Sequence, residues 1–192
     1  MREGRRTEAS WLTHRQRELP QVTYPHHFES VVNVAATPEA LFAEIDDPSR
    51  LAGHMTRSSI MMAGSRMEFS YDEAGGKAAG SKITMAGSIL GLRIALQEIV
   101  TDRVRPFHKV WETVGEPRLL VIGGYRMGFN ITPDAEGSIL KVFIDWREPP
   151  APWRWLGRLF GRTYARWCTE SMARGAASSF ENPPTLQRNV AT

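Results

Sequence analysis

The chain has 192 residues, 42% of them hydrophobic, so it can bury one good-sized core and is expected to form a single domain with tails. Its 24 basic and 21 acidic residues leave a formal charge of only +3, a smaller excess than dedicated nucleic-acid-binding proteins usually carry, and we expect no nucleic-acid partner. The single cysteine, Cys168, excludes an internal disulfide and a cysteine-based zinc site. The sequence has no uncharged apolar run of about 18 residues and no apolar core of a secretory signal, so the expected location is cytoplasmic.

The first elements in chain order are a strand and two short helices. Residues 1–22 are rich in charge and poor in large apolar side chains, which predicts a flexible N-terminal arm before a domain at 23–181. The stretch HFESVVNVA alternates in the manner of a half-buried strand. Thr37 is suited to cap a helix with Pro38 at its first position, and Pro48 breaks this helix before a second short one.

From residue 66 to Glu148 the chain reads as strands separated by turns. Turn signals such as EAGGKAAG and PDAEG are too short to hold crossover helices, so neighbouring strands should pair antiparallel as a meander. The prolines at 149, 150 and 152 end the sheet, a long helix follows as far as Phe180, and residues 182–192 are expected to form a disordered tail. The expected strands are RMEFSYD, SKITMAGSI, LRIALQEIV, HKVWETV, RLLVIGGYRMGFNIT and SILKVFIDWRE.

The long helix is the only element long enough to cover the apolar face of this meander. At about 100° per residue, bulky side chains in its first half share one face with small or weakly polar ones in its second half, and four arginines lie opposite. Because the small residues cannot fill the space above a curved sheet, a cavity is expected there. The predicted inner face consists of Trp153, Leu156, Phe160, Tyr164, Trp167, Ser171, Gly175 and Ser178.

Candidate ligand-binding residues come from both sides of this expected cavity. Aromatic residues and methionines would supply apolar contact, and a polar group such as His54, at the end of the second short helix, would orient one end of a ligand. The alternative is that these residues only pack against one another as an ordinary core. The candidates are His54, Met85, Trp111, Tyr125, Met127, Phe129, Ile144, Trp146, Tyr164, Trp167 and Ser171.

The order of these elements resembles a known superfamily. The stretches FESVVNVAATPEALFAEIDDPSRLAGHM and KVWETVGEPRLLVIGGYRMGF, with the aromatic C-terminal helix, are similar over residues 24–180 to the helix-grip or SRPBCC superfamily, which includes START domains, the birch-pollen-allergen type and polyketide cyclase/dehydrase-like proteins. The resemblance implies an α+β fold with a curved antiparallel sheet of about seven strands wrapped around the long helix. It also implies a deep cavity for lipids, sterols, polyketides or similar molecules. No residues of a cyclase match one by one, so it assigns no catalytic residue.

The strand parity decides whether charged side chains enter the cavity. If Trp111, Tyr125 and Trp146 face inward, alternation sends Glu112, Arg126 and Asp145 to the solvent side. With the opposite parity, Glu112, Arg126 and Asp145 would be the polar groups of the pocket, and a bulge at Gly123-Gly124 could switch the parity within a strand. We favour the aromatic side chains inward, because the helix needs a broad apolar surface to cover.

The outer face of the long helix offers a second candidate site. Arginines recur there at every fourth position, with Trp155 and Leu159 within or beside the row. This pattern fits a solvated face with two exposed apolar residues, and it also fits a surface that meets anionic lipid headgroups or a protein partner. The residues of this candidate surface are Arg154, Trp155, Arg158, Arg162 and Arg166.

Three functions remain open at this point. The first is a carrier or sensor of a small hydrophobic molecule, the second a cyclase or dehydratase type of enzyme, and the third a module that docks on a membrane or partner. A buried acid–base pair in the cavity would favour the enzyme, and a single polar anchor would favour the carrier. No metal or cofactor is expected, since the adjacent His26 and His27 point to opposite faces of a strand. The sequence leaves the oligomeric state open.

Overall fold

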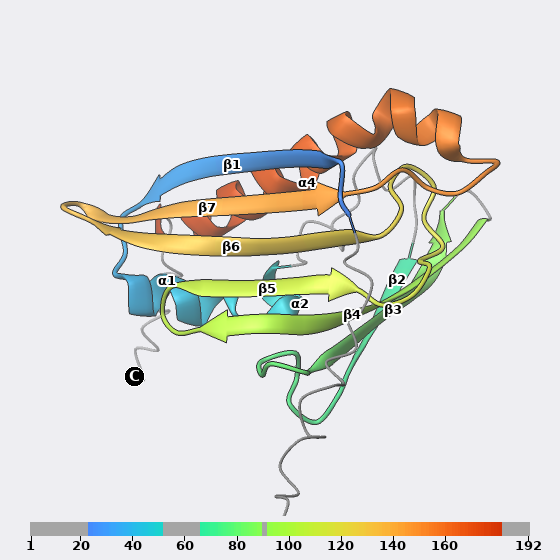
Figure 1. Cartoon of the computed structure of the whole chain (residues 1–192). Helices are drawn as coiled ribbons and strands as arrows, with labels where there is room; N and C mark the ends of the chain where they lie inside the picture. The colour runs from blue at the N-terminus through green and yellow to red at the C-terminus, as the bar shows by residue number, and fades with distance from the viewer. Residues whose placement is uncertain (1–22, 52–65, 90–91, 182–192) are drawn as a thin grey trace, which may run out of the picture.

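The computed structural model describes residues 23–51, 66–89 and 92–181 (Figure 1). The predicted arm at 1–22, the predicted tail at 182–192 and the candidate His54 lie outside these ranges. The described elements are β1 (His26–Val34), α1 (Pro38–Ile45), α2 (Pro48–Leu51), β2 (Arg66–Tyr71), β3 (Lys82–Ile89), β4 (Leu92–Val104), β5 (His108–Thr113), β6 (Tyr125–Asp134), β7 (Gly137–Trp146) and α4 (Arg154–Glu181).

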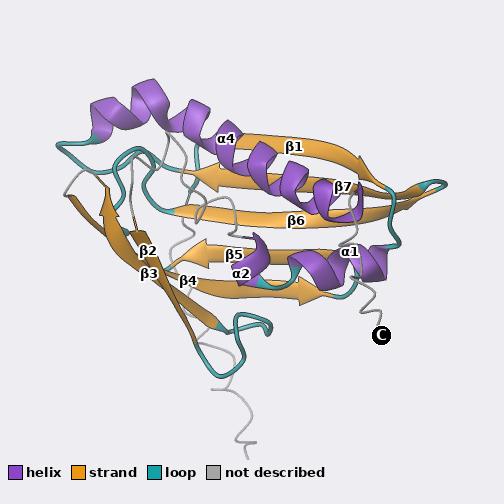
Figure 2. Ribbon diagram, turned by 180° about the vertical axis from the view of Figure 1, so that it is seen from behind, coloured by secondary structure: helices purple, strands orange, loops and turns teal. Residues whose placement is uncertain are grey.

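Seven strands form one antiparallel sheet in the order β1-β7-β6-β5-β4-β3-β2. Strands β2 to β7 follow one another as a meander, and β1 pairs with β7 at the far edge. All three described helices lie on one side of this sheet, and the β2, β3 and β4 part is turned strongly relative to the β5, β6 and β7 part (Figure 2). The predicted seven-stranded sheet, the two short helices after the first strand and the long C-terminal helix are confirmed.

The longest predicted strand, residues 118–132, is wrong in its first half. Strand β6 begins only at Tyr125, and residues 118–124 form a connection with one isolated bridge, between Arg118 and Ala95. Gly123 donates its N–H to the carbonyl of Arg147 at 2.7 Å, and a Cβ at Gly123 would lie 2.5 Å from the carbonyl oxygen of Glu148. This close approach fits only glycine. The register shift of the sheet lies in β4, between Val100 and Asp102, rather than at Gly123-Gly124.

The two faces of the sheet differ as strand alternation predicts. Trp111, Tyr125 and Trp146 are buried on the side of the helices. On the outer side, Arg126 forms an ion pair with Asp145 at 2.8 Å, and the neighbouring strand carries Glu112. The favoured parity is therefore confirmed, with the aromatic side chains inward.

Helix α4 packs mainly against β1 and β7, and it does so through a different face from the predicted one. The row that meets the sheet is made of small residues at every fourth position. A Cβ at Gly157 would lie 2.4 Å from Cδ of Pro149, and one at Gly161 would lie 3.1 Å from the carbonyl oxygen of Val121, so glycine is what permits this close approach. The buried residues of α4 are Gly157, Gly161, Ala165, Cys168, Thr169, Met172, Ala173, Ala176 and Ala177.

The predicted inner face of α4 is thus wrong in rotation. Phe160, predicted to be inside, is 45% exposed, and Gly175 and Ser178 are also exposed. Tyr164 and Trp167 are partly buried and pack against the core. The helical periodicity correctly identified a row of large apolar side chains on α4. The helix nevertheless approaches the sheet along its row of small residues, because glycine and alanine allow the backbone to come closer.

Candidate ligand-binding pocket

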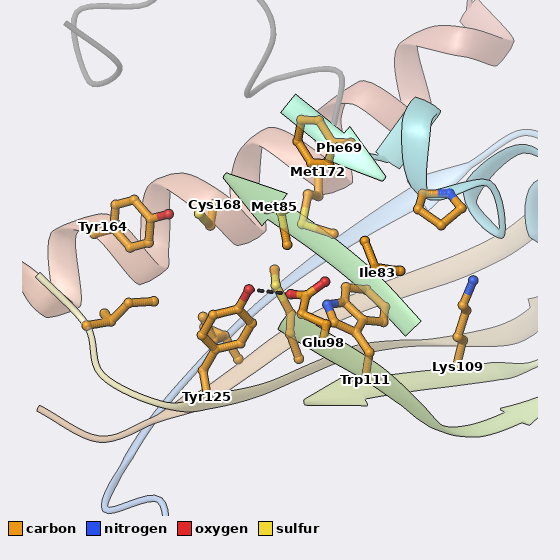
Figure 3. Close-up of a pocket in the computed structure, with 14 residues that line it drawn as sticks. Phe69, Ile83, Met85, Glu98, Lys109, Trp111, Tyr125, Tyr164, Cys168 and Met172 are labelled. Atoms are coloured by element: carbon orange, nitrogen blue, oxygen red, sulfur yellow. Dashed lines mark hydrogen bonds between the residues drawn. The ribbon is translucent and has the colours of Figure 1, made fainter. Parts of the chain in front are cut away.

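A pocket lies between the inner face of the sheet and the middle of α4, with α2 at one end (Figure 3). Its volume is about 80 Å³, several times the ~10–15 Å³ that one water needs. Most lining side chains are apolar. The lining residues are Pro48, Phe69, Ile83, Met85, Glu98, Lys109, Trp111, Ile122, Tyr125, Met127, Ile144, Tyr164, Cys168 and Met172.

Glu98 is the central polar group of this pocket. It lies in β4 with the same parity as Leu96 and Val100, so the strand that buries these two apolar side chains also carries the carboxyl group inward. Glu98 is only 4% exposed. The hydroxyl of Tyr125 donates a short hydrogen bond to its Oε1 (Figure 3). The side chain of Trp111 donates a second hydrogen bond to the carboxyl group.

The surroundings of Glu98 shift the pKa of its carboxyl group towards neutral pH. Burial raises the pKa of Glu98 from its ordinary 4.5 to about 7, although the hydrogen bonds from Tyr125 and Trp111 and the charge of Lys109 act in the opposite direction. Burial dominates because the two donors are neutral and none of the cations in the described part of the chain pairs directly with the carboxylate. A carboxyl group of this kind can give or take a proton at physiological pH.

Tyr164 and Cys168 lie one helical turn apart on α4 and face the Tyr125 end of the pocket (Figure 3). Their side chains are hydrogen-bonded to each other. Burial raises the pKa of the Cys168 thiol to about 12, so the thiol stays protonated and is a poor nucleophile. Burial and the neighbouring Cys168 also raise the pKa of Tyr164 well above 10. These two groups can therefore serve as neutral hydrogen-bonding partners.

Lys109 occupies the opposite end of the pocket, below α2 (Figure 3). Its Nζ donates to the backbone carbonyl of Asp46 at 2.6 Å and to Oδ1 of Asp46 at 2.9 Å. Arg103 donates two further hydrogen bonds to the same carboxylate, at 3.0 and 2.7 Å. Because Asp46 is itself fixed by Arg103, it holds the ammonium group of Lys109 in place, and this ion pair joins β5 to the end of α1.

Three solved structures are similar to this arrangement. The Zhui aromatase/cyclase from Streptomyces sp. R1128 matches with a TM-score of 0.60 at 14% identity, over 81% of this chain and 93% of that one. Norcoclaurine synthase from Thalictrum flavum matches with a TM-score of 0.54 at 15% identity, over 80% and 84% of the two chains. The di-domain ARO/CYC StfQ from the steffimycin biosynthetic pathway matches with a TM-score of 0.60 at 13% identity, over 81% and 50%.

The chain has the Bet v 1-like helix-grip fold. At these identities the likeness is one of backbone arrangement, and it transfers no residue role. No family model matches the sequence, and no curated protein does. The pocket and the surface of this helix-grip protein therefore carry the information about its function.

Six of the candidate ligand-binding residues line the pocket of this helix-grip protein, and four described ones do not. Phe129 is fully buried between Phe42 and Trp111 in edge-to-face contacts, at centroid distances of 5.7 and 6.4 Å, and Trp146 stacks on His26 at 5.3 Å. These two residues belong to the core, and Trp167 and Ser171 are partly buried away from the pocket lining. The residues that line it are Met85, Trp111, Tyr125, Met127, Ile144 and Tyr164.

Glu98 and Lys109 are the two charged pocket residues that were not predicted from the sequence. A charged residue within a strand is ordinarily assigned to solvent, and neither was considered. Strand alternation could nevertheless have predicted that both side chains point inward. Glu98 lies on the same face of its strand as Leu96, and Lys109 lies on the same face as Trp111. The charged residues that were considered, Glu112, Arg126 and Asp145, lie on the outer face.

Metal binding finds no support in the part of the chain that the structure describes. No three His, Cys, Asp or Glu side chains among the residues at 23–51, 66–89 and 92–181 are grouped to hold an ion. Of the described polar groups that line the pocket, only Glu98 combines near-complete burial with a pKa close to neutrality. The chemistry that this arrangement can offer is hydrogen bonding and proton transfer in an apolar cavity.

Proposed function

We propose that this helix-grip protein binds a small, mostly hydrophobic molecule in the pocket, with one polar group of that molecule against Glu98. The observation that carries the proposal is a nearly enclosed carboxyl group, 4% exposed, in a cavity whose other lining residues are mostly apolar. Apolar side chains supply most of the affinity in such sites, and a few convergent polar groups orient the ligand. The structural neighbours include proteins named as aromatase/cyclase and norcoclaurine synthase, which supports a pocket that takes small organic molecules.

The first experiment is native mass spectrometry of gently purified protein, followed by denaturation and extraction. A discrete co-purified hydrophobic compound would support the proposal and name the ligand class. The second is titration with 2-naphthol, a fluorescent aromatic alcohol that can place its hydroxyl at Glu98. Saturable binding is expected, and a protein that carries no compound and shows no saturable binding would contradict the proposal.

A matched pair of variants locates the binding site. Glu98→Gln should weaken 2-naphthol binding about tenfold, because a hydrogen bond to a carboxylate is stronger than one to an amide. Glu112→Gln changes the same group on the neighbouring strand, where Glu112 pairs with Ile99, the residue after Glu98, and should leave binding unchanged. Equal effects of the two substitutions would place the ligand outside the pocket.

A second candidate function is an enzyme of the cyclase or dehydratase type. The specific observation in its favour is Glu98 itself, whose pKa is raised to about 7 and whose carboxyl group meets the Tyr125 hydroxyl. In this role Glu98 would move a proton on a carbonyl compound while Tyr125 keeps the carboxyl group in position. The apolar lining would hold the substrate in a folded conformation.

Hydrogen–deuterium exchange at the α-carbon of 2-tetralone, followed by NMR, separates the enzyme from a carrier. An enzyme should accelerate the exchange, with a rate that rises as pH passes about 7 and Glu98 ionises. Glu98→Gln should lower that rate by ~10²-fold or more, whereas Glu112→Gln should not. A protein that binds 2-naphthol but leaves the exchange at the buffer rate would be a carrier or sensor.

A further inference from the structure

The first half of α4 exposes three large apolar side chains. Trp155 and Leu159 are each 62% exposed, and Phe160 is 45% exposed. Trp155 and Leu159 lie one turn apart on the same side of the helix, and Phe160 follows Leu159 in the chain, so all three are grouped in the first turns of α4. Figure 1 shows these first turns of α4 extending past the ends of β1 and β7, where the sheet does not cover them. Contiguous exposed apolar surface of this kind marks an interaction site.

Positive charge surrounds the same patch. Arg154, Arg158, Arg162 and Arg166 are all exposed, and no acidic residue lies between Glu148 and Glu170. The two flanking glutamates offset part of the charge: Arg154 and Arg158 approach Glu148 at 4.0 and 3.3 Å, and Arg166 pairs with Glu170 at 2.7 Å. Arg162 lies over the ring of Phe28 at 5.8 Å. Four arginines against two glutamates leave this surface with a net charge of +2.

Charge and apolar side chains alternate around the exposed part of the helix. At about 100° per residue, the row that holds Trp155 and Leu159 lies directly beside the row of arginines. A guanidinium at the end of a long side chain can reach a phosphate while a neighbouring Trp or Leu enters the acyl boundary. A nucleic acid would explain the arginines but not the exposed Leu159, and an apolar protein surface would explain Leu159 but not the positive charge.

We propose that the first half of α4 docks on the surface of an anionic lipid bilayer. Trp155, Leu159 and Phe160 enter the interface, and the arginines contact the lipid phosphates. In the described ranges 23–51, 66–89 and 92–181, no helix is long and apolar enough to span a membrane. The contact is therefore one of docking by a helix that lies along the surface.

The docking surface adjoins the pocket along one row of α4. Phe160 lies one turn before Tyr164, which lines the pocket, and Tyr164 lies one turn before Cys168, which also lines it. A molecule that leaves the bilayer at Phe160 would thus contact apolar or weakly polar side chains along its path to Glu98. This consequence rests on the proposed ligand binding, whereas the docking itself does not.

Vesicle co-sedimentation of the full chain tests the docking. We expect binding to vesicles of phosphatidylcholine with 30% phosphatidylserine, weaker binding to pure phosphatidylcholine, and a loss of affinity as salt rises. Arg158→Glu with Arg162→Glu should lower the affinity for the anionic vesicles by about 30-fold or more, since each arginine near such a surface accounts for roughly a fivefold change. Trp155→Ser with Leu159→Ser should lower the affinity for both vesicle types.

The matched control is Arg126→Glu with Lys141→Glu, an exposed and a partly exposed cation on the outer face of the sheet that also pair with acids. This variant has the same net charge as the arginine variant and should keep vesicle binding. Equal loss in both variants, binding that does not weaken with salt, or no vesicle binding by the unmodified protein would overturn the proposal. Selective binding of RNA oligonucleotides in place of vesicles would also overturn it. 2-Naphthol binding should persist in every variant, so a failure of docking is distinguishable from a failure of ligand binding.

Discussion

Two carboxyl groups on the inner side of the sheet are almost equally buried and behave in opposite ways. Asp46 is 7% exposed and Glu98 is 4% exposed. Although burial acts to raise it, the pKa of Asp46 is lowered by hydrogen bonds from Arg103 and Lys109 and by their charges. Burial raises the pKa of Glu98 to about 7, because its direct donors are a phenol and an indole.

What each of these two carboxyl groups can do depends on whether its partners outweigh the effect of burial, as they do at Asp46 and do not at Glu98. Asp46 is held as a carboxylate between two cations and ties α1 to β4 and β5, which is a structural role. Glu98 can change its protonation state near neutral pH and faces an apolar cavity, which suits binding or proton transfer. Removing each carboxyl group in turn should therefore have different consequences, and the following variants test this difference.

The largest effect is expected for Asp46→Asn. The substitution leaves the buried ammonium of Lys109 and the guanidinium of Arg103 without their shared anion, and breaking a buried pair in this way costs about 3–5 kcal/mol. Urea denaturation at pH 7 measures the free energy of unfolding. A loss below about 1 kcal/mol would mean that Lys109 reaches water after the substitution, and the structural role of Asp46 would then be wrong.

The second effect concerns the pH dependence of stability. Between pH 4.5 and about 7 the native state keeps a proton on Glu98 that the unfolded chain has lost, so the free energy of unfolding should fall as pH rises through this window. The decrease amounts to roughly 3 kcal/mol in total. Urea denaturation of the unmodified protein and of Glu98→Gln across this range measures it. Glu98→Gln should flatten the slope, and an unchanged slope would assign the titration to another group.

Tyr125→Phe should have a smaller effect, with a defined direction. The hydroxyl of Tyr125 hydrogen-bonds the carboxylate form of Glu98, so its removal should raise the pKa of Glu98 further and lower stability at pH 7 by about 1–2 kcal/mol. A ¹³C NMR titration of the glutamate carboxyl groups follows the shift directly. If the pKa of Glu98 falls in this variant, the hydrogen bond does not favour the charged form.

The smallest effect is expected on the outer face, for Asp145→Asn. Asp145 also has two basic partners, Arg126 at 2.8 Å and His27 at 2.6 Å, but both partners are exposed and can return to water. The expected loss is below about 1 kcal/mol and should shrink further in high salt. Asp145→Asn is thus the solvent-facing match of Asp46→Asn. A cost similar to that of Asp46→Asn would show that the outer face is less solvated than its exposure indicates.

Strand alternation alone could have predicted many of the side chains that point into the pocket. The alternation that places Trp111 inward also places Lys109 inward, and the one that buries Leu96 and Val100 also buries Glu98. The charged residues predicted as possible pocket groups, Glu112, Arg126 and Asp145, form the outer ladder, and the inner acid Glu98 was not among them. Alternation predicts a face for every residue of a strand, including the charged ones.

The sequence by itself determined the number and order of the strands, the two short helices, the single long helix and the inward face of the strand residues Trp111, Tyr125 and Trp146. These features follow from local alternation, turn residues and prolines, which act over a few positions. The tertiary structure alone decided which side of α4 meets the sheet, because that choice depends on how closely Gly157 and Gly161 approach Pro149 and Val121. It also decided the protonation of Asp46 and Glu98, since the charges that meet a buried carboxyl group come from strands and helices distant in the chain.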